Sequence, residues 1–167
     1  MKSKKDFSEH KNQKIKEFFI WQDIVKNPTC DFSAYCVSHN VPNLLNVFQS
    51  LYNSLEKFGP SKGTIFCDEV SREQIISLEK EGFNKRIWIR YLKLIADPTM
   101  PKQMLYEKET LQLTMGSADL NEIIKLLQKY SANKIHAFSA FSVPKKTSKN
   151  RESTSDLHFF YNLQGID

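Results

Sequence analysis

Two stretches of the chain repeat the same order of secondary-structure signals, and this order limits the folds that the chain can adopt. Each stretch runs from a strand-like segment, beginning at Thr64 or Thr110, through a helical segment with an Ile-Ile pair to an Asn-Lys dipeptide and a second strand. The turn-forming segment 97–101 lies between the stretches. Strand, helix, strand, turn, strand, helix, strand over residues 63–143 is the order of a ferredoxin-like core, with both helices on one face of a four-stranded antiparallel sheet.

Local signals define the expected helices. A proline near its first position and a Gly-Pro pair after its last predict a helix over 42–58. A Ser-x-x-Gln capping box predicts a helix over 71–81, and a serine cap predicts one over 117–130. Apolar residues at helical spacing before Pro28 predict a further helix over 8–26.

Short alternating or apolar runs define the expected strands. These strands cover residues 31–37, 64–67, 86–94, 104–114, 134–143 and 157–163. The 167 residues amount to one domain. We therefore predict a single α+β domain over 1–167, in which the ferredoxin-like core carries two N-terminal helices and an extra C-terminal strand.

Cysteine content and apolar runs indicate the compartment. The three cysteines are an odd number and too few for a disulfide framework. The lysine-rich first 20 residues lack the apolar block of a signal peptide, and no apolar run reaches the length of a membrane span. We expect a cytoplasmic protein that does not associate with membranes.

The net charge of +5 is concentrated in two segments. Residues 1–16 carry +4 and residues 144–156 carry +2, which leaves −1 for the rest of the chain. We expect a flexible basic arm over 1–7 and a flexible basic loop over 144–156, because both are rich in charge and have too few apolar residues to offset the entropy of ordering. The basic side chains of this loop are candidate binding residues: Lys145, Lys146, Lys149 and Arg151. Such segments can bind polyanions through counterion release, or they can simply be solvated.

The strand predicted over 86–94 holds the other candidate binding residues. Alternation places Arg86, Trp88 and Arg90 on one face of this strand. A tryptophan between two arginines suits a protein interface and also suits base stacking with phosphate contacts. Alternatively, Trp88 packs in the core while the arginine side chains reach solvent.

Catalytic and metal-binding patterns are weak. Cys30, Cys36 and His39 are the nearest approach to a zinc site, but their spacing supplies three ligands and one close pair. Asp68 and Glu69 follow a buried strand, although no phosphate-binding loop accompanies them. We therefore expect no catalytic residues, no metal and no cofactor.

Three functions remain open. The first is a non-enzymatic binding protein of the adaptor or toxin-neutralising type, acting through a protein partner. The second is an RNA-binding module that uses the basic arm and the Arg/Trp face. The third is a metal-dependent hydrolase around Asp68. The sequence leaves the oligomeric state open.

Overall fold

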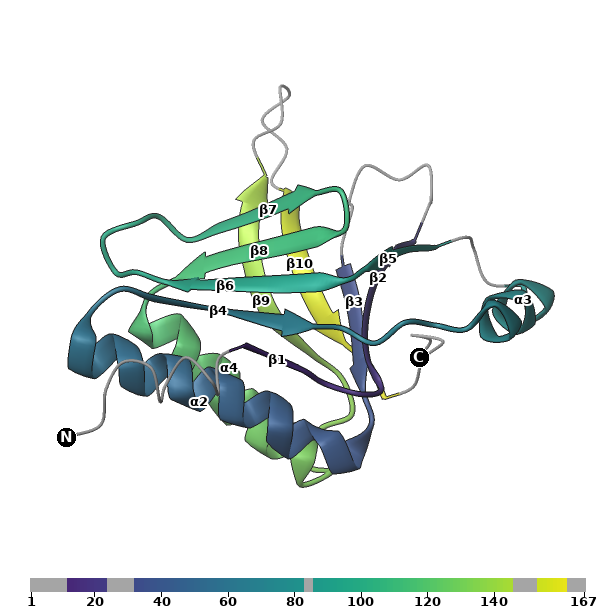
Figure 1. Ribbon diagram of the computed structural model, residues 1–167, viewed down its shortest axis with the longest axis horizontal. Helices are drawn as coiled ribbons and strands as arrows, with labels where there is room; N and C mark the ends of the chain where they lie inside the picture. The colour runs from purple at the N-terminus through teal and green to yellow at the C-terminus, as the bar shows by residue number, and fades with distance from the viewer. Residues whose placement is uncertain (1–11, 24–31, 83–85, 146–152, 162–167) are drawn as a thin grey trace.

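Two mixed five-stranded sheets form the framework of the protein. The computed structural model describes residues 12–23, 32–82, 86–145 and 153–161. Sheet A contains, in spatial order, β1 (Asn12–Lys14), β4 (Ser61–Phe66), β6 (Tyr91–Ala96), β8 (Thr110–Met115) and β7 (Gln103–Glu107). Sheet B contains β5 (Arg86–Ile89), β2 (Phe18–Asp23), β3 (Phe32–Cys36), β10 (Ser153–Phe159) and β9 (Phe138–Lys145). The strands of sheet A run across those of sheet B (Figure 1).

The chain passes between the two sheets at one corner. β1 in sheet A leads into β2 in sheet B, and β5 in sheet B leads into β6 in sheet A. Hydrogen bonds close the corner: the Cys67 amide donates to the Arg90 carbonyl at 2.9 Å, and the Asp68 amide donates to the Phe18 carbonyl at 2.8 Å. The two sheets are thereby held in a fixed relation.

Two long helices cover one side of the framework. α2 (Val41–Phe58) and α4 (Ser117–Ser131) pack against each other, α2 also against β4 and α4 against β9 (Figure 1). Each buries an apolar stripe, including Leu51 of α2 and Leu127 of α4, against the inner faces of the sheets. One hydrophobic core thus joins both helices and both sheets. None of the described helices is both long and apolar enough to cross a membrane.

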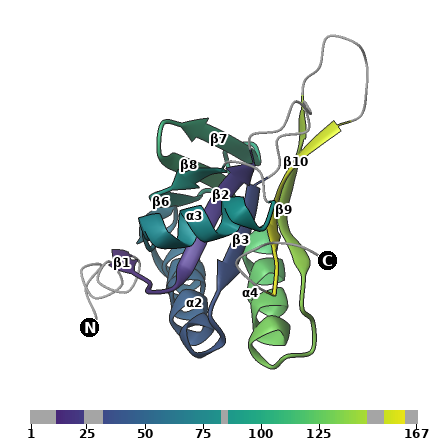
Figure 2. The same ribbon diagram turned by 90° about the vertical axis from the view of Figure 1, so that its right-hand side faces the viewer.

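The third helix lies apart from the other two. α3 (Arg72–Lys80) is at the sheet B end of the molecule, away from α2 and α4 (Figures 1 and 2). Ser71 caps it as predicted: its hydroxyl accepts from the Gln74 amide, and the Gln74 side chain accepts from the Ser71 amide. Leu78 is the only residue of α3 that is buried. The capping box at Ser71 therefore contributes a large part of the stability of this helix.

The α+β class is confirmed, but the ferredoxin-like arrangement is not. The strands expected in one antiparallel sheet are divided between two sheets, because β5 and β9 belong to sheet B. In addition, β6 pairs with β8 in parallel. The helices over 71–81 and 117–130 exist close to their predicted bounds, yet they do not lie side by side on one sheet face.

The prediction of an N-terminal helix over 8–26 is wrong for the part of this segment that the structure describes. Residues 12–14 and 18–23 form β1 and β2 instead. Phe18, Phe19, Ile20 and Trp21 are all buried, so this segment buries side chains on both faces of sheet B. A strand buried on both faces produces a continuous apolar run, which a helical pattern can imitate.

Three further boundaries differ from the prediction. The strand over 86–94 is interrupted at Arg90, where the chain changes sheets. The strand over 104–114 folds back on itself as the β7–β8 hairpin, and Lys108 in its turn has a φ of 54°. Both ends of the loop predicted over 144–156 belong to strands, because β9 extends to Lys145 and β10 begins at Ser153. Residues 146–152 and the basic arm over 1–7 lie outside the described residues.

Candidate functional site

Sheet A has one buried face and one open face. Its inner residues, including Ile65, Leu92 and Leu111, are at most 1% exposed beneath α2 and α4. We call the opposite side the outer face; its described residues are Asn12, Lys14, Lys62, Thr64, Phe66, Tyr91, Lys93, Ile95, Gln103, Leu105, Glu107, Thr110, Gln112 and Thr114. All of these except Thr114 are at least partly exposed. No described helix covers the outer face (Figure 1).

One row across the outer face combines three hydrogen-bond donors. Thr64 on β4 pairs with Lys93 on β6, which pairs in turn with Gln112 on β8. Their hydroxyl, ammonium and amide groups can each donate to an anion. We call Thr64, Lys93 and Gln112 the donor row. Leu105 on β7, which is 46% exposed, continues this row to the sheet edge.

The neighbouring row is partly aromatic. Phe66 pairs with Tyr91, and Tyr91 with Thr110, which pairs with Glu107. The rings of Phe66 and Tyr91 are in edge-to-face contact, with centroids 5.6 Å apart and an interplanar angle of 82°. Both side chains remain more than one third exposed. The outer face therefore sets apolar surface directly beside the donor row.

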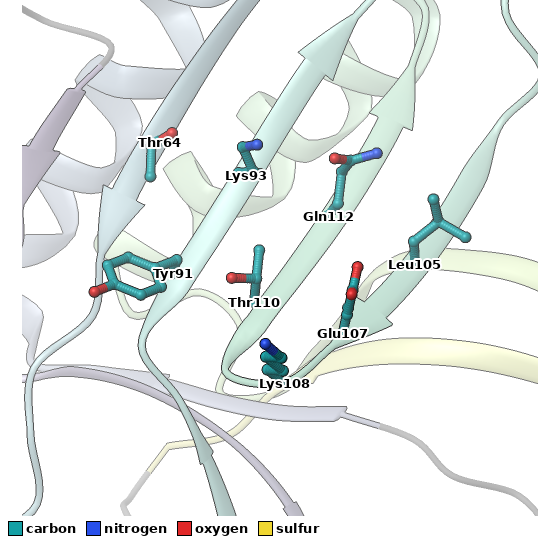
Figure 3. Close-up of a pocket in the computed structure, with 8 residues that line it drawn as sticks. All are labelled: Thr64, Tyr91, Lys93, Leu105, Glu107, Lys108, Thr110 and Gln112. Carbon is teal, nitrogen blue, oxygen red and sulfur yellow. The ribbon is translucent and has the colours of Figure 1, made fainter.

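The two rows border a hollow of about 470 Å³. Figure 3 shows Lys93 beside Gln112 at one end of the hollow and Lys108 beside Glu107 at the other. In the described part of the chain, no carboxylate oxygen lies within 4 Å of the ammonium nitrogen of Lys93 or Lys108. The hollow thus combines an apolar wall with two positive charges that have no ion-pair partner in that part.

No protein-family model matches this chain, and no curated protein has a sequence that matches it significantly.

Alternation predicts that Arg86, Trp88 and Arg90 share one face of a strand, and in the structure their side chains differ in exposure. The Arg86 side chain is 4% exposed and forms an ion pair with Asp23, with 3.0 Å between Nε and the carboxylate oxygen. Trp88 is partly buried and packs against Trp21, with ring centroids 5.7 Å apart. These two side chains lie on the side of sheet B away from the inner core.

Arg90 has a different environment from Arg86. It follows β5, where the chain turns toward sheet A, and half of its side chain is exposed. Its guanidinium lies 3.2 Å from a Glu69 oxygen and 3.4 Å from a Glu109 oxygen. Arg90 therefore links the segment after β4 to the β7–β8 turn. Trp88 and Arg90 still line one open cleft, which is separate from the outer face of sheet A.

Most of the candidate binding residues of the basic loop lie outside the residues that the structure describes. Lys145 is the last residue of β9. Lys146, Lys149 and Arg151 lie outside the described residues, and their role as binding residues stays a prediction.

The three candidate zinc ligands do not form a metal site in the part of the chain that the structure describes. Cys30 lies outside the described residues, Cys36 is buried on β3, and His39 is exposed on the short helix η1 (Ser38–Asn40). Burial, together with the Glu17 charge, raises the pKa of Cys36 to about 12, and burial also raises the pKa of Cys67. Thiols held in the protonated form are poor metal ligands. No group of three potential ligands occurs among the described residues.

Asp68 has a structural environment. Its Oδ2 accepts from the Glu17 amide and its Oδ1 from the Glu69 amide, each at 2.8 Å. Lys14 lies 4.0 Å from Oδ1. The carboxylate therefore joins the β1–β2 turn to the segment after β4.

The outer face cannot be recognised as a site from the sequence alone. The alternation of Tyr91, Lys93 and Ile95 with buried leucines was visible, as was that of Thr110, Gln112 and Thr114. These patterns show that each strand has one polar face, but the row across β4, β6 and β8 depends on their register. Long-range pairing sets that register, and no local signal encodes it.

Proposed function

We propose that the protein acts as a binding protein and that its partner is another protein, which docks on the outer face of sheet A. One observation carries this proposal: Tyr91 and Leu105, 37% and 46% exposed, line a hollow on a sheet face that no described helix covers, and the exposed ring of Phe66 packs on Tyr91. Exposed apolar groups gathered among polar ones are typical of protein-interaction surfaces.

A protein partner suits this face better than a nucleic acid does. Base stacking needs accessible ring faces, whereas Phe66 and Tyr91 meet edge to face. The Arg/Trp face also gives less support to RNA binding than the sequence suggests, because the Arg86 side chain is nearly buried and is paired with Asp23.

Affinity capture with matched variants tests the proposal. The tagged protein is incubated with a nuclease-treated extract of the cells that produce it, in parallel with Leu105→Arg and Ile76→Arg. Both substitutions place a charge at an exposed apolar residue, but Ile76 is on α3 and outside the outer face. We expect a stoichiometric protein to be retained by the parent and by Ile76→Arg, and lost with Leu105→Arg.

Two results would contradict the proposal. Capture that is unaffected by Leu105→Arg would place the partner elsewhere on the molecule. A partner that is captured from untreated extract and is absent from the nuclease-treated extract would favour the nucleic-acid function. Circular dichroism of both variants shows whether the fold is kept, so that lost binding is not confused with unfolding.

A further inference from the structure

The cations that line the hollow differ from several others on the molecule. Arg86 pairs with Asp23, Arg90 with Glu69 and Glu109, and Lys102 with Asp119. Lys93 and Lys108 have no such partner among the described residues, although both line the same hollow. The outer face and the β7–β8 turn together carry four lysines, Lys14, Lys62, Lys93 and Lys108, against two glutamates, Glu107 and Glu109, and Glu109 is paired with Arg90. This surface is therefore complementary to an anionic partner.

The donor row indicates where an anionic group would lie. Neighbouring strands are about 4.8 Å apart, so donors on three adjacent strands span about 10 Å. A carboxylate has two oxygens and can accept several hydrogen bonds, and those from an ammonium group are the stronger ones. A carboxylate beside Lys93 would also have the Gln112 amide within reach. Glu107 lies at the far end of the hollow (Figure 3), so it would not repel an anion bound there.

We propose that the partner presents an acidic segment in which an aspartate or glutamate binds the donor row. This inference rests on the proposed function. The carboxylate of the acidic residue lies against Lys93, between the Thr64 hydroxyl and the Gln112 amide. A neighbouring apolar side chain of the same segment packs on Tyr91, in the adjacent row. Charge complementarity and the order of the two rows together select an acidic residue next to an apolar one.

Selection from random peptides tests this partner chemistry. A displayed library of random dodecapeptides is selected on the full-length protein, and clones that also bind the Tyr91→Ala variant are removed. We expect the surviving peptides to be enriched in Asp or Glu next to Leu, Phe, Tyr or Trp. If no peptide depends on Tyr91, the proposed function itself fails at this face. If peptides depend on Tyr91 but carry no acidic enrichment, only the present inference fails.

Charge reversal at Lys93 then tests the donor row. For a selected peptide, we expect Lys93→Glu to weaken binding by about 10- to 100-fold, the range for loss of a charged hydrogen bond. The same peptide with Lys in place of its acidic residue should bind Lys93→Glu better than it binds the parent. Lys125→Glu is the matched control, since Lys125 is exposed on α4, away from the outer face.

Three results would overturn the inference. The first is an acidic peptide that binds the parent and Lys93→Glu equally well. The second is an equal loss with Lys125→Glu, which would show a general charge effect. The third is displacement of the peptide by oligothymidylate at lower concentration than by the free peptide, with a steep salt dependence. That result would assign the donor row to phosphate groups instead.

Discussion

The guanidinium of Arg86 lies over the indole of Trp21, with 4.6 Å between the guanidinium carbon and the ring centroid. Trp21 is fully buried, and Arg86 and Trp88 are its neighbours on the paired strand β5. Asp23, two residues along β2, pairs with the same guanidinium. Arg86 thus joins β5 to β2 by a cation–π contact and an ion pair at the edge of sheet B. Its role in this structure is to hold that edge.

Arg86→Ala should lower the free energy of unfolding by about 2–4 kcal/mol, because it leaves the Asp23 carboxylate without its partner and uncovers Trp21. The value is below that of a fully buried pair, since Asp23 is partly exposed. Urea denaturation followed by tryptophan fluorescence gives the difference. Arg90→Ala is the control: its ion pairs are exposed, so it should cost about 0–1 kcal/mol. Equal losses for the two variants would refute this distinction.

Trp88→Ala separates packing from binding at this strand. Trp88 contacts Trp21 and Phe19, with ring centroids 5.7 and 6.3 Å apart. We expect a loss of about 2–4 kcal/mol, somewhat less than for a fully buried aromatic residue. Thermal denaturation measures the loss. At a temperature where the variant is still folded, partner capture should match the parent. A variant of normal stability that no longer binds would restore Trp88 as an interface residue.

The parts of the fold that follow local rules were predictable. The helix over 42–58 was predicted within one residue, because proline at its start and glycine at its end act locally. The cap at Ser71 was likewise correct. The run Phe18–Trp21 is a strand although its apolar spacing also fits a helix, and its aromatic content is the local feature that favours the strand.

The arrangement of the sheets and the site were not predictable in the same way. The chain changes sheets at Arg90, where the Arg90 amide donates to the Glu109 carbonyl at 2.8 Å. This contact joins residues 19 positions apart in sequence. Likewise, Thr64, Lys93 and Gln112 become neighbours only through the pairing of β4, β6 and β8. Predicting a site from such residues requires the register first.

Leu51→Ala tests the core that joins the two long helices to the sheets. Leu51 lies in α2 and has no exposed surface. Removing its side chain should cost about 2–5 kcal/mol through lost burial and a residual cavity. Asn53→Ala, at an exposed position of the same helix, should leave stability within about 0.5 kcal/mol. Urea midpoints of the two variants measure the contrast, and similar midpoints would mean that α2 does not bury Leu51.

The buried thiol of Cys36 should make the protein sensitive to alkaline pH. Burial is the larger cause and the Glu17 charge the smaller one, and together they raise its pKa from 9.0 to about 12. The thiol also donates to the Val37 carbonyl, with 3.6 Å between sulfur and oxygen, which favours the protonated form. Because the folded-state pKa is above the unfolded one, this contribution to stability is complete below pH 9.0 and is lost as the pH rises toward 12.

Two measurements check this expectation. In a Cys30→Ser background, iodoacetamide at neutral pH should leave Cys36 and Cys67 unmodified in the native protein and alkylate both in urea, as read by mass spectrometry. Urea midpoints should fall between pH 9.0 and about 12, and Cys36→Ala should show a smaller fall over this range. Burial also raises the pKa of Cys67 and Tyr130, so a smaller alkaline fall should persist in Cys36→Ala. Rapid alkylation of Cys36 in the native protein would show that its thiol is accessible and would remove the basis for the alkaline effect.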